Sequence, residues 1–315
     1  MYTPSGMQTN LTTLFEDYIS ECLYIRRLRP ETVRGYREIF RHFQKIMPEI
    51  TSTSLLCIGT LTEFFKRIQL RLRKAGKDRI VTGLKSSTVR TYWSKLNSFL
   101  TWLVIKKIIE SNPLASLKAP TVEYGDEKAL TKEQLQKIIA AIILHPQKTL
   151  LLRRDIAIFH MLIFAGLRKN ELISLRVMDI DLDKRELLIR AETSKSKRVR
   201  ILPIHPTLGY HLKEYFGERN KAGYKTSALW VHWNKDTALT NHGLKHWVKR
   251  LCRLSGVKFH LHQFRHSFAC ALAKKNINAI KIQKLLGHAD ISMTMTYLRS
   301  LSTEDLRDDI AMLSI

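Results

Sequence analysis

The feature that most restricts how this chain can fold is a break in its hydrophobic pattern between residues 110 and 130. Pro113, Pro120 and Gly125 lie in this stretch, which has mixed charge and little periodicity, as a linker does. A chain of 315 residues is long enough for two domains, each with its own core. The sequence predicts a first domain over residues 1–118, a linker over residues 119–128 and a second domain over residues 129–315.

Before the break, apolar residues recur at helical spacing. Residues 29–47 begin with a Pro-Glu start signal for a helix. Residues 86–107 repeat the apolar spacing and begin with Ser and Thr residues that are candidate N-caps. The opposite face of the second segment carries Arg90, Lys95 and Lys106. A solvated charge is an equally good interpretation for any single one. Together they favour a helical domain that contacts a phosphate backbone, with Arg90 and Lys95 as candidate DNA contacts.

After the break, helices mix with strands. Thr131 begins a helix with the capping-box spacing Thr131-x-x-Gln134, and an apolar helix over residues 154–166 ends at Gly166. Residues 177–204 alternate apolar and polar side chains on both sides of a basic turn, as antiparallel strands do. Further helices are expected at residues 240–256, 262–276, 279–287 and 303–313. The expected fold is mainly α, with a small antiparallel β-sheet in the second domain.

The charge of the chain indicates its partner. Lys and Arg number 53 against 28 Asp and Glu, which gives a formal net charge of +25 and a pI near 10.0. Residues 1–125 hold 20 basic and 10 acidic residues and the remainder holds 33 and 18, so both parts are basic. Because the cations form no polybasic tail or amphipathic stripe, nucleic acid is favoured over a membrane surface as the polyanionic partner.

Two features concern location. The longest apolar run, residues 156–167, is too short to span a bilayer, and the N-terminus lacks the basic start and apolar run of an export signal. The cysteines Cys22, Cys57, Cys252 and Cys270 form no C-x-x-C pair and are expected to be small apolar residues with reduced thiols. The sequence predicts a cytoplasmic protein without a membrane partner, associated with the nucleoid when it binds DNA.

Four separated segments carry side chains that could act together on a phosphodiester. They are AGLRKNEL with Arg168 and Glu171, SKSKRVRILPI with Lys195 and Lys197, HLHQFRHSF with His262 and Arg265, and LLGHADISMTMTYLRS with His288 and Tyr297. A tyrosine hydroxyl can attack phosphorus, although forming its phenolate at pH 7 costs about 4 kcal/mol. Paired arginines suit the charge on the nonbridging oxygens, and lysine or histidine can protonate the leaving 5′-oxygen.

Taken alone, each residue has a simpler interpretation. Tyr297 would be a buried aromatic residue, and Arg168 would be a cation that satisfies carbonyls at a helix end. Lys195 and Lys197 would be a solvated hairpin or plain phosphate contacts.

The sequence also raises the question of a metal. His262 and His266 are four residues apart on an expected helix, but Gln263 replaces the glutamate of H-E-x-x-H, and Arg265 would place a cation beside the metal. No carboxylate cluster or Gly-rich loop accompanies the four segments, so neither a metal nor a nucleotide cofactor is implied.

The segment HQFRHSFACALAKKNINAIKIQKLLGHADISMTMTYLRS resembles the C-terminal signature of the tyrosine recombinases, the family of the phage integrases and Xer proteins. That signature is H-x-x-R, then L-G-H, then a tyrosine. Here Arg265 and His288 are 23 residues apart, and Tyr297 lies nine residues further on. AGLRKNEL resembles the family's first arginine box, and NPLASLKAP resembles its interdomain linker. The resemblance is specific from about residue 129 to the end and loose before it.

This resemblance implies a role for each candidate. Arg168 and Arg265 would clamp the scissile phosphate, and His288 would hydrogen-bond to it. Tyr297 would be the nucleophile, and His262 would assist its proton transfer.

The resemblance also implies a general acid. Lys195 would protonate the leaving 5′-oxygen, because it precedes Pro203 by eight residues as the family's hairpin lysine does, and Lys197 would contact DNA. In the family this lysine usually sits beside glycines, whereas two serines flank it here. Glu171 matches the acidic position after the first arginine and would support the site from behind.

The implied function is site-specific DNA recombination through a covalent 3′-phosphotyrosine, for integration or excision of a mobile element or for resolution or inversion of DNA. The resemblance implies two domains closing as a C-shaped clamp around duplex DNA, with a homotetramer on two recombination sites. Alternatives are a DNA-binding accessory protein without chemistry and a type IB topoisomerase. A metal nuclease would need ligands that the sequence does not offer.

Overall fold

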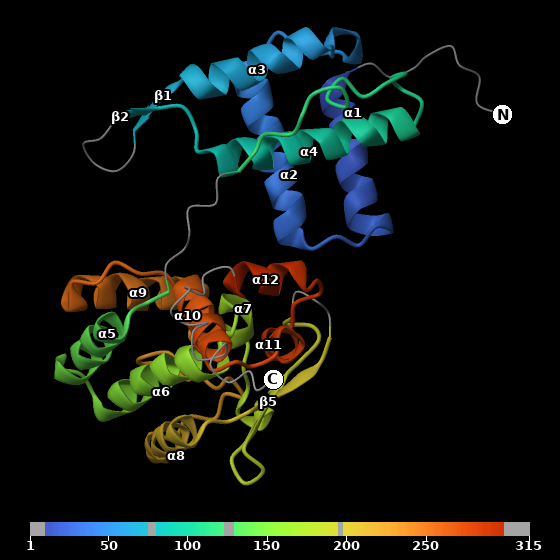
Figure 1. The fold of residues 1–315 in the computed structure, drawn as a ribbon. Helices are drawn as coiled ribbons and strands as arrows, with labels where there is room; N and C mark the ends of the chain where they lie inside the picture. Colours follow the sequence, from blue (N-terminus) through green and yellow to red (C-terminus); the bar gives the residue numbers. More distant parts are fainter. Residues whose placement is uncertain (1–9, 75–79, 123–128, 195–197, 299–315) are drawn as a thin grey trace, which may run out of the picture. The chain divides into compact units, whose positions relative to one another are not determined.

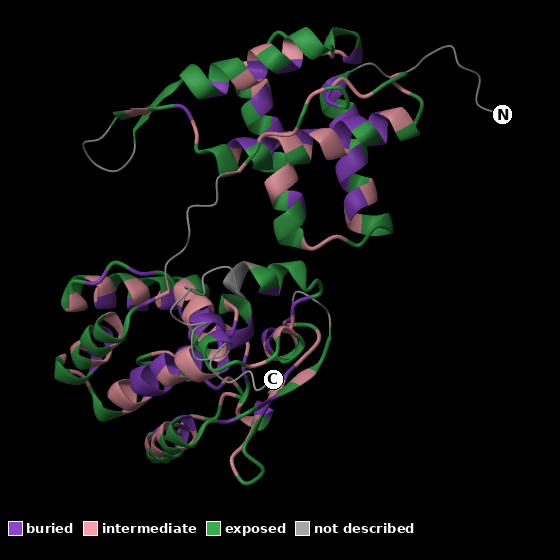
Figure 2. Cartoon of the chain, viewed as in Figure 1, coloured by how far each residue is buried: buried purple, intermediate pink, exposed green. Residues whose placement is uncertain are grey.

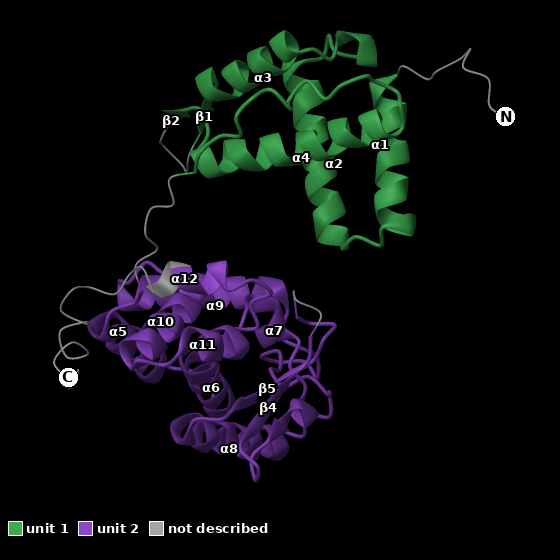
Figure 3. Ribbon diagram, turned by 45° about the vertical axis from the view of Figure 1, so that its right-hand side comes forward, with its two compact units in different colours: residues 1–125 green, residues 126–315 purple. Residues whose placement is uncertain are grey.

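The computed structural model describes residues 10–74, 80–122, 129–194 and 198–298, except for the side chains of residues 296–298. The chain divides into two compact units, residues 1–125 and 126–315 (Figure 3). Both are mainly helical and both contain a small antiparallel sheet, which confirms the expected fold class. The sequence had indicated a sheet in the second part only. The helix expected at residues 303–313 lies outside the described residues.

The first unit consists of four main helices and a hairpin (Figure 1). Its elements are α1 (Leu11–Ser20) with a π turn (Glu21–Ile25), α2 (Pro30–Ile46), a 3₁₀ turn (Thr53–Leu55), α3 (Ile58–Leu70), β1 (Leu72–Lys74), β2 (Ile80–Thr82) and α4 (Ser86–Ile105).

Aromatic packing holds this unit together. The ring of Phe15 on α1 stacks on Phe40 of α2, with centroids 3.8 Å apart, and meets Phe99 of α4 edge-on at 5.2 Å. The apolar residues that recur at helical spacing in the sequence therefore form the buried faces of these helices, which pack against one another. One detail differs from expectation, since Lys85 holds the N-cap position of α4 without a side-chain cap where Ser or Thr was expected.

The described part of the second unit combines helices with a three-stranded sheet. Its elements are α5 (Lys132–Leu144), α6 (Thr149–Ala165), α7 (Lys169–Ile173), a 3₁₀ turn (Val177–Asp179), β3 (Ile180–Asp181), β4 (Glu186–Ile189), β5 (Arg200–Pro203), α8 (Pro206–Lys221), α9 (Asn241–Ser255), α10 (Leu261–Lys274), α11 (Ala279–Leu286) and α12 (Ser292–Leu298).

Local signals in the sequence set several of these boundaries. The capping box at Thr131 forms as expected, with the Gln134 backbone N–H donating to Thr131 Oγ1 at 3.2 Å. Helix α6 is buried along most of its length, as Figure 2 shows, because it is apolar on nearly every face. It ends at Gly166, which adopts the left-handed conformation with φ of 55°.

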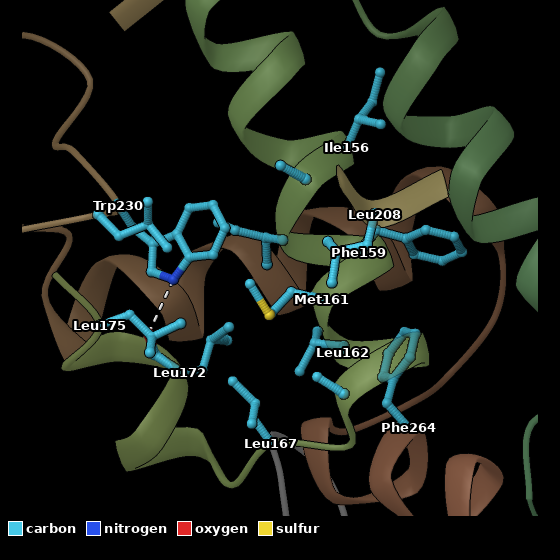
Figure 4. Packing of buried hydrophobic residues seen from close by; sticks show 14 of the residues in the cluster. Ile156, Phe159, Met161, Leu162, Leu167, Leu172, Leu175, Leu208, Trp230 and Phe264 are labelled. Carbon is cyan, nitrogen blue, oxygen red and sulfur yellow. Dashed lines mark hydrogen bonds between the residues drawn. The ribbon is translucent and has the colours of Figure 1, made fainter. Parts of the chain in front are cut away.

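The core around α6 also fixes the segments that carry the candidate residues (Figure 4). Leu167 and Leu172 lie on either side of Arg168 and Glu171 in the chain and are buried in this core. The Trp230 indole N–H donates to the Leu172 carbonyl at 2.9 Å. Packing of apolar side chains therefore determines where the polar groups beside them point.

The sheet has the order β3-β4-β5, and both pairings are antiparallel. Leu187 on β4 lies opposite Leu202 on β5, and both are buried. The β4–β5 connection contains residues 195–197, which lie outside the described residues. In the described part of the chain, no helix has the length and apolar character needed to cross a membrane.

Candidate active site

Four of the described candidate residues, Arg168, Glu171, Arg265 and His288, lie where several helices begin or end. Helix α6 stops at Gly166, Arg168 is the N-cap of α7, and α11 stops at Gly287. Gly166 is required there, because a Cβ atom at this position would lie 2.4 Å from Cδ1 of Phe268 on α10. A tight crossing of chain segments thus brings α10 against the end of α6.

Arg265 lies in the first turns of α10 and is almost completely buried, with 1% of its surface exposed. Its Nη1 donates to the Gly166 carbonyl at 2.9 Å and its Nη2 to the Leu286 carbonyl at 2.7 Å. These carbonyls come from the ends of two different helices. These two hydrogen bonds hold the guanidinium group in one orientation, and the carbonyl groups that accept them carry no formal charge.

Arg168 reaches the same helix end. Its Nη1 donates to the Leu286 carbonyl at 3.3 Å and its Nη2 to the Gly287 carbonyl at 3.2 Å. Arg168 and Arg265 thus share one acceptor, the carbonyl of Leu286. The two arginines singled out in the sequence are 97 positions apart and are brought side by side by the fold.

Glu171 lies behind Arg168, and its side chain is fully buried. It accepts the Arg168 backbone N–H at 2.9 Å, as in a capping box, and the Arg168 Nη1 at 3.0 Å. Burial alone would raise the pKa of this carboxyl, but the guanidinium groups of Arg200 and Arg168 hold that pKa below its ordinary value. Glu171 is therefore a buried carboxylate shared by two arginines.

Arg200 is a member of this cluster that the sequence did not reveal. It begins β5, donates Nη1 and Nη2 to the two carboxylate oxygens of Glu171 at 3.0 and 2.8 Å, and donates Nε to the Leu285 carbonyl at 3.1 Å. The available signal was the strand alternation, which places Arg200 on the same face as buried Leu202. A cation at an inward position needs a partner, and here it is Glu171.

His288 follows Gly287 and is 7% exposed. Its Nδ1 lies 2.8 Å from the hydroxyl of Thr294, which is completely buried. Burial first, and then the charges of Arg265, Arg168 and Arg200 and the nearby His262, lower the pKa of His288 to about 4. The imidazole is thus neutral at physiological pH, and it can donate one hydrogen bond without adding charge.

The remaining candidates are placed less fully. His262 is exposed near the start of α10, three residues before Arg265, and it is close enough to His288 to affect that residue's pKa. Tyr297 lies in α12, which packs against α10 and α11, but its side chain lies outside the described part of the structure. Lys195 and Lys197 also lie outside the described residues. Their roles stay predictions.

The described cluster favours an anionic ligand. It contains three guanidinium groups and one carboxylate, so two positive charges are in excess. A surface pocket of about 450 Å³ opens beside it, lined among others by Arg198, Arg200 and His288. A phosphodiester carries one negative charge shared by two nonbridging oxygens, which can accept hydrogen bonds from guanidinium groups.

A metal finds no comparable support. Among the residues that the structure describes, no three His, Cys, Asp or Glu side chains are grouped so that they could hold a metal ion. His266, the second histidine of the zinc hypothesis, has its Nε2 3.5 Å from Sγ of Cys270.

The two candidate DNA contacts of the first unit lie on α4 and also have partners within the unit. Arg90 is exposed, lies over the Trp93 ring and donates to the Pro120 carbonyl at 3.2 Å. The Lys95 ammonium lies 4.5 Å from the centre of the Tyr36 ring. These partners are aromatic rings and a carbonyl group, which carry no formal negative charge.

Comparison with known proteins agrees with the resemblance seen in the sequence. The model of the phage integrase family matches residues 128–304. A tyrosine recombinase of Thermosipho africanus is 27% identical over 296 residues, covering 92% of this chain and 95% of that protein. Tyrosine recombinase XerA of Saccharolobus solfataricus is 32% identical over 225 residues, covering 71% of this chain and 67% of its own.

Solved structures share the fold. The Tn1549 transposon integrase in complex with circular intermediate DNA has a TM-score of 0.75 at 17% identity, with 97% of this chain and 100% of that chain covered. The XerH site-specific recombinase bound to palindromic difH substrate, in a post-cleavage complex, has a TM-score of 0.69 at 20% identity, with 94% and 83% covered.

Proposed function

Because this chain belongs to the phage integrase family, we infer that it is a tyrosine-type site-specific DNA recombinase. The observation that carries this conclusion is that Arg168 and Arg265 both donate to the Leu286 carbonyl at the end of α11, two residues before His288. These residue types at this spacing resemble the signature of the family, and their proximity supports the proposal that they bind an anion.

In the proposed reaction, the Tyr297 oxygen attacks the scissile phosphorus. The bond from phosphorus to the 5′-oxygen breaks, the 3′-phosphate becomes ester-linked to Tyr297, and the 5′-oxygen takes a proton from Lys195. His262 assists removal of the tyrosine proton. Attack by a 5′-hydroxyl from the partner strand reverses each bond change and rejoins the DNA.

The two arginines act on the charge that develops in this step. Arg168 and Arg265 donate to the nonbridging oxygens, and their fixed carbonyl anchors mean that little reorganisation is needed when the phosphorus becomes five-coordinate. Neutral His288 donates its N–H to the same phosphate. No step calls for a metal or a nucleotide, since the cations of the chain itself stabilise the transition state.

The assembly is part of the proposal. Both units are basic, and in this proposal both contact duplex DNA, with the first unit as the helical DNA-binding domain and the second as the catalytic domain. Four protomers on two recombination sites exchange strands in pairs. Such a protein works where the nucleoid is, in the cytoplasm.

The test is to trap the covalent intermediate. A nicked suicide duplex is built from the site that footprinting finds in the DNA flanking the gene. Wild-type protein is expected to form an adduct that survives denaturation, whereas Tyr297→Phe should bind the duplex equally well and form none. An adduct with the phenylalanine variant would exclude Tyr297 as the nucleophile, and its absence with wild type would favour an accessory DNA-binding protein.

A second assay separates recombination from relaxation. With two sites on one supercoiled plasmid, a recombinase yields deletion or inversion products. A type IB topoisomerase would relax the plasmid without joining the sites. Relaxation alone, with no recombinant product, would exclude the recombinase.

A further inference from the structure

The two arginines that share Glu171 bind it unequally. Arg200 contacts both carboxylate oxygens through two guanidinium nitrogens, at 3.0 and 2.8 Å. Arg168 uses one guanidinium nitrogen, Nη1, on one oxygen at 3.0 Å, and turns Nη2 toward the Gly287 carbonyl. The fork-to-fork pair, which is the stronger geometry for a carboxylate, is therefore the one with Arg200.

This difference matters because Glu171 is fully buried and Arg200 nearly so, at 9% side-chain exposure. In such surroundings, opposite charges attract strongly and a buried carboxylate is stable only when it is paired. Without Arg200, Arg168 would be the cation left beside Glu171 in the described cluster. Arg168 would then be drawn into the paired geometry, and its charge would be cancelled.

A second set of contacts ties Arg200 to the same helix end. Arg200 Nε donates to the Leu285 carbonyl. Gly287 has a φ of 66°, and a Cβ atom there would lie 2.8 Å from Arg200 Nη1. Arg200 therefore packs directly under the segment that leads into His288.

We propose that Arg200 is a positioning residue, which occupies the Glu171 carboxylate so that Arg168 keeps its charge and its orientation toward the scissile phosphate. The inference rests on the proposed recombinase reaction. Arg200 does not touch the DNA in this proposal; it acts by competing with Arg168 for one carboxylate. If the Glu171 carboxylate is removed, Arg200 is no longer needed to keep it from Arg168, so removing both should restore activity.

The experiment measures adduct formation on the nicked suicide duplex by Arg200→Met, Glu171→Gln and the double variant. Arg200→Met is expected to slow adduct formation about 100-fold, the scale for loss of one positioned donor to the phosphate. Adding Glu171→Gln should restore the rate to within about 10-fold of wild type, because the neutral amide no longer binds Arg168 as an ion pair. Noncovalent binding of the duplex should change little, which places the defect in the chemical step.

Two controls accompany these variants. Lys213→Met removes an exposed cation on α8, a helix that contributes no residue to the cluster, and should leave the rate unchanged. If Arg200→Met does not fold by circular dichroism, Arg200→Gln, which also lacks the positive charge, replaces it, alone and with Glu171→Gln, and the same rescue is expected.

The outcomes are distinct. A rescued double variant supports the competition between the two arginines. A double variant that is as slow as the single one, or slower, overturns the proposal, because purely structural losses would add. A single variant with the wild-type rate overturns it as well. Absence of any wild-type adduct would instead contradict the proposed function itself.

Discussion

The protonation state of His288 decides which hydrogen bond this residue can donate in the proposed reaction. Its pKa of about 4 leaves the ring neutral at pH 7, so it carries one N–H. Nδ1 is 2.8 Å from the Thr294 hydroxyl. If Thr294 donates to Nδ1, the proton is fixed on Nε2, which is then the donor for the phosphate. The buried Thr294 hydroxyl on α12 would in this way determine which ring nitrogen of His288 carries the proton.

We therefore expect Thr294→Val to impair the reaction without preventing folding. Valine has nearly the shape of threonine but cannot hold the tautomer, so adduct formation should fall about 10-fold, on the scale of losing one hydrogen bond to a buried group. Thr294→Ser keeps the hydroxyl and should retain most of the activity. Equal rates for the two variants, measured on the suicide duplex, would exclude this role for Thr294.

The sequence predicted the residues whose spacing is local and missed those that depend on tertiary contact. Arg265 and His288 belong to one recognisable segment, and Arg168 follows a helix stop that Gly166 announces. Arg200 and Thr294 become visible only when β5 and α12 are placed against the end of α11. Strand alternation indicates that Arg200 points inward, but it does not identify the helix end that Arg200 contacts.

At the scale of elements, the sequence predicted the helices that have an apolar stripe at helical spacing and clear signals at their ends. The helices at α2, α5 and α9 agree with their signals within about two residues. Helix α8 was not predicted, and it contains Gly209 and Gly217, which weaken a helix by about 1 kcal/mol each. This helix is stabilised instead by the packing of its buried side chains on the core, those of Leu208, Leu212 and Tyr215.

The interface between α6 and α8 leads to a prediction on pH. His160 of α6 and His211 of α8 stack with ring centres 4.2 Å apart. Burial, then His160 and Arg153, lower the pKa of His211 to about 4, and burial lowers that of His160. Below pH 6.5 these histidines bind protons in the unfolded chain but stay neutral in the folded chain, so the free energy of unfolding should fall as the pH is lowered from 6.5 to 4. Urea denaturation followed by tryptophan fluorescence measures this.

The matched variant for this prediction is His211→Phe. A phenyl ring can keep the stack but cannot be protonated, and no partner is lost at Nδ1, which has no hydrogen bond in the described structure. The variant should lose part of the pH dependence while remaining close to wild type at pH 7. The same slope of stability against pH in both proteins would show that His211 does not titrate in this window.

At the scale of the whole molecule, charge is distributed over both units. The first unit has 20 basic and 10 acidic residues, and the second has 33 and 18. An enzyme that only needed its catalytic cluster to meet a phosphate would not require a basic first unit. The distribution therefore supports a long contact with the DNA backbone, in which sequence-independent attraction supplies much of the affinity.

Such a contact predicts a steep dependence of binding on salt. If the full chain neutralises six to ten phosphates, its affinity for the footprinted duplex should fall about 10³- to 10⁵-fold between 50 and 200 mM salt. Arg90→Gln should weaken binding and reduce the slope of log K against log salt by about one, because one phosphate contact is lost from α4. Lys213→Gln removes the same charge from α8 and should leave the slope unchanged. Equal slopes for Arg90→Gln and wild type would place the DNA elsewhere on the first unit, and a shallow slope for wild type would contradict the long contact altogether.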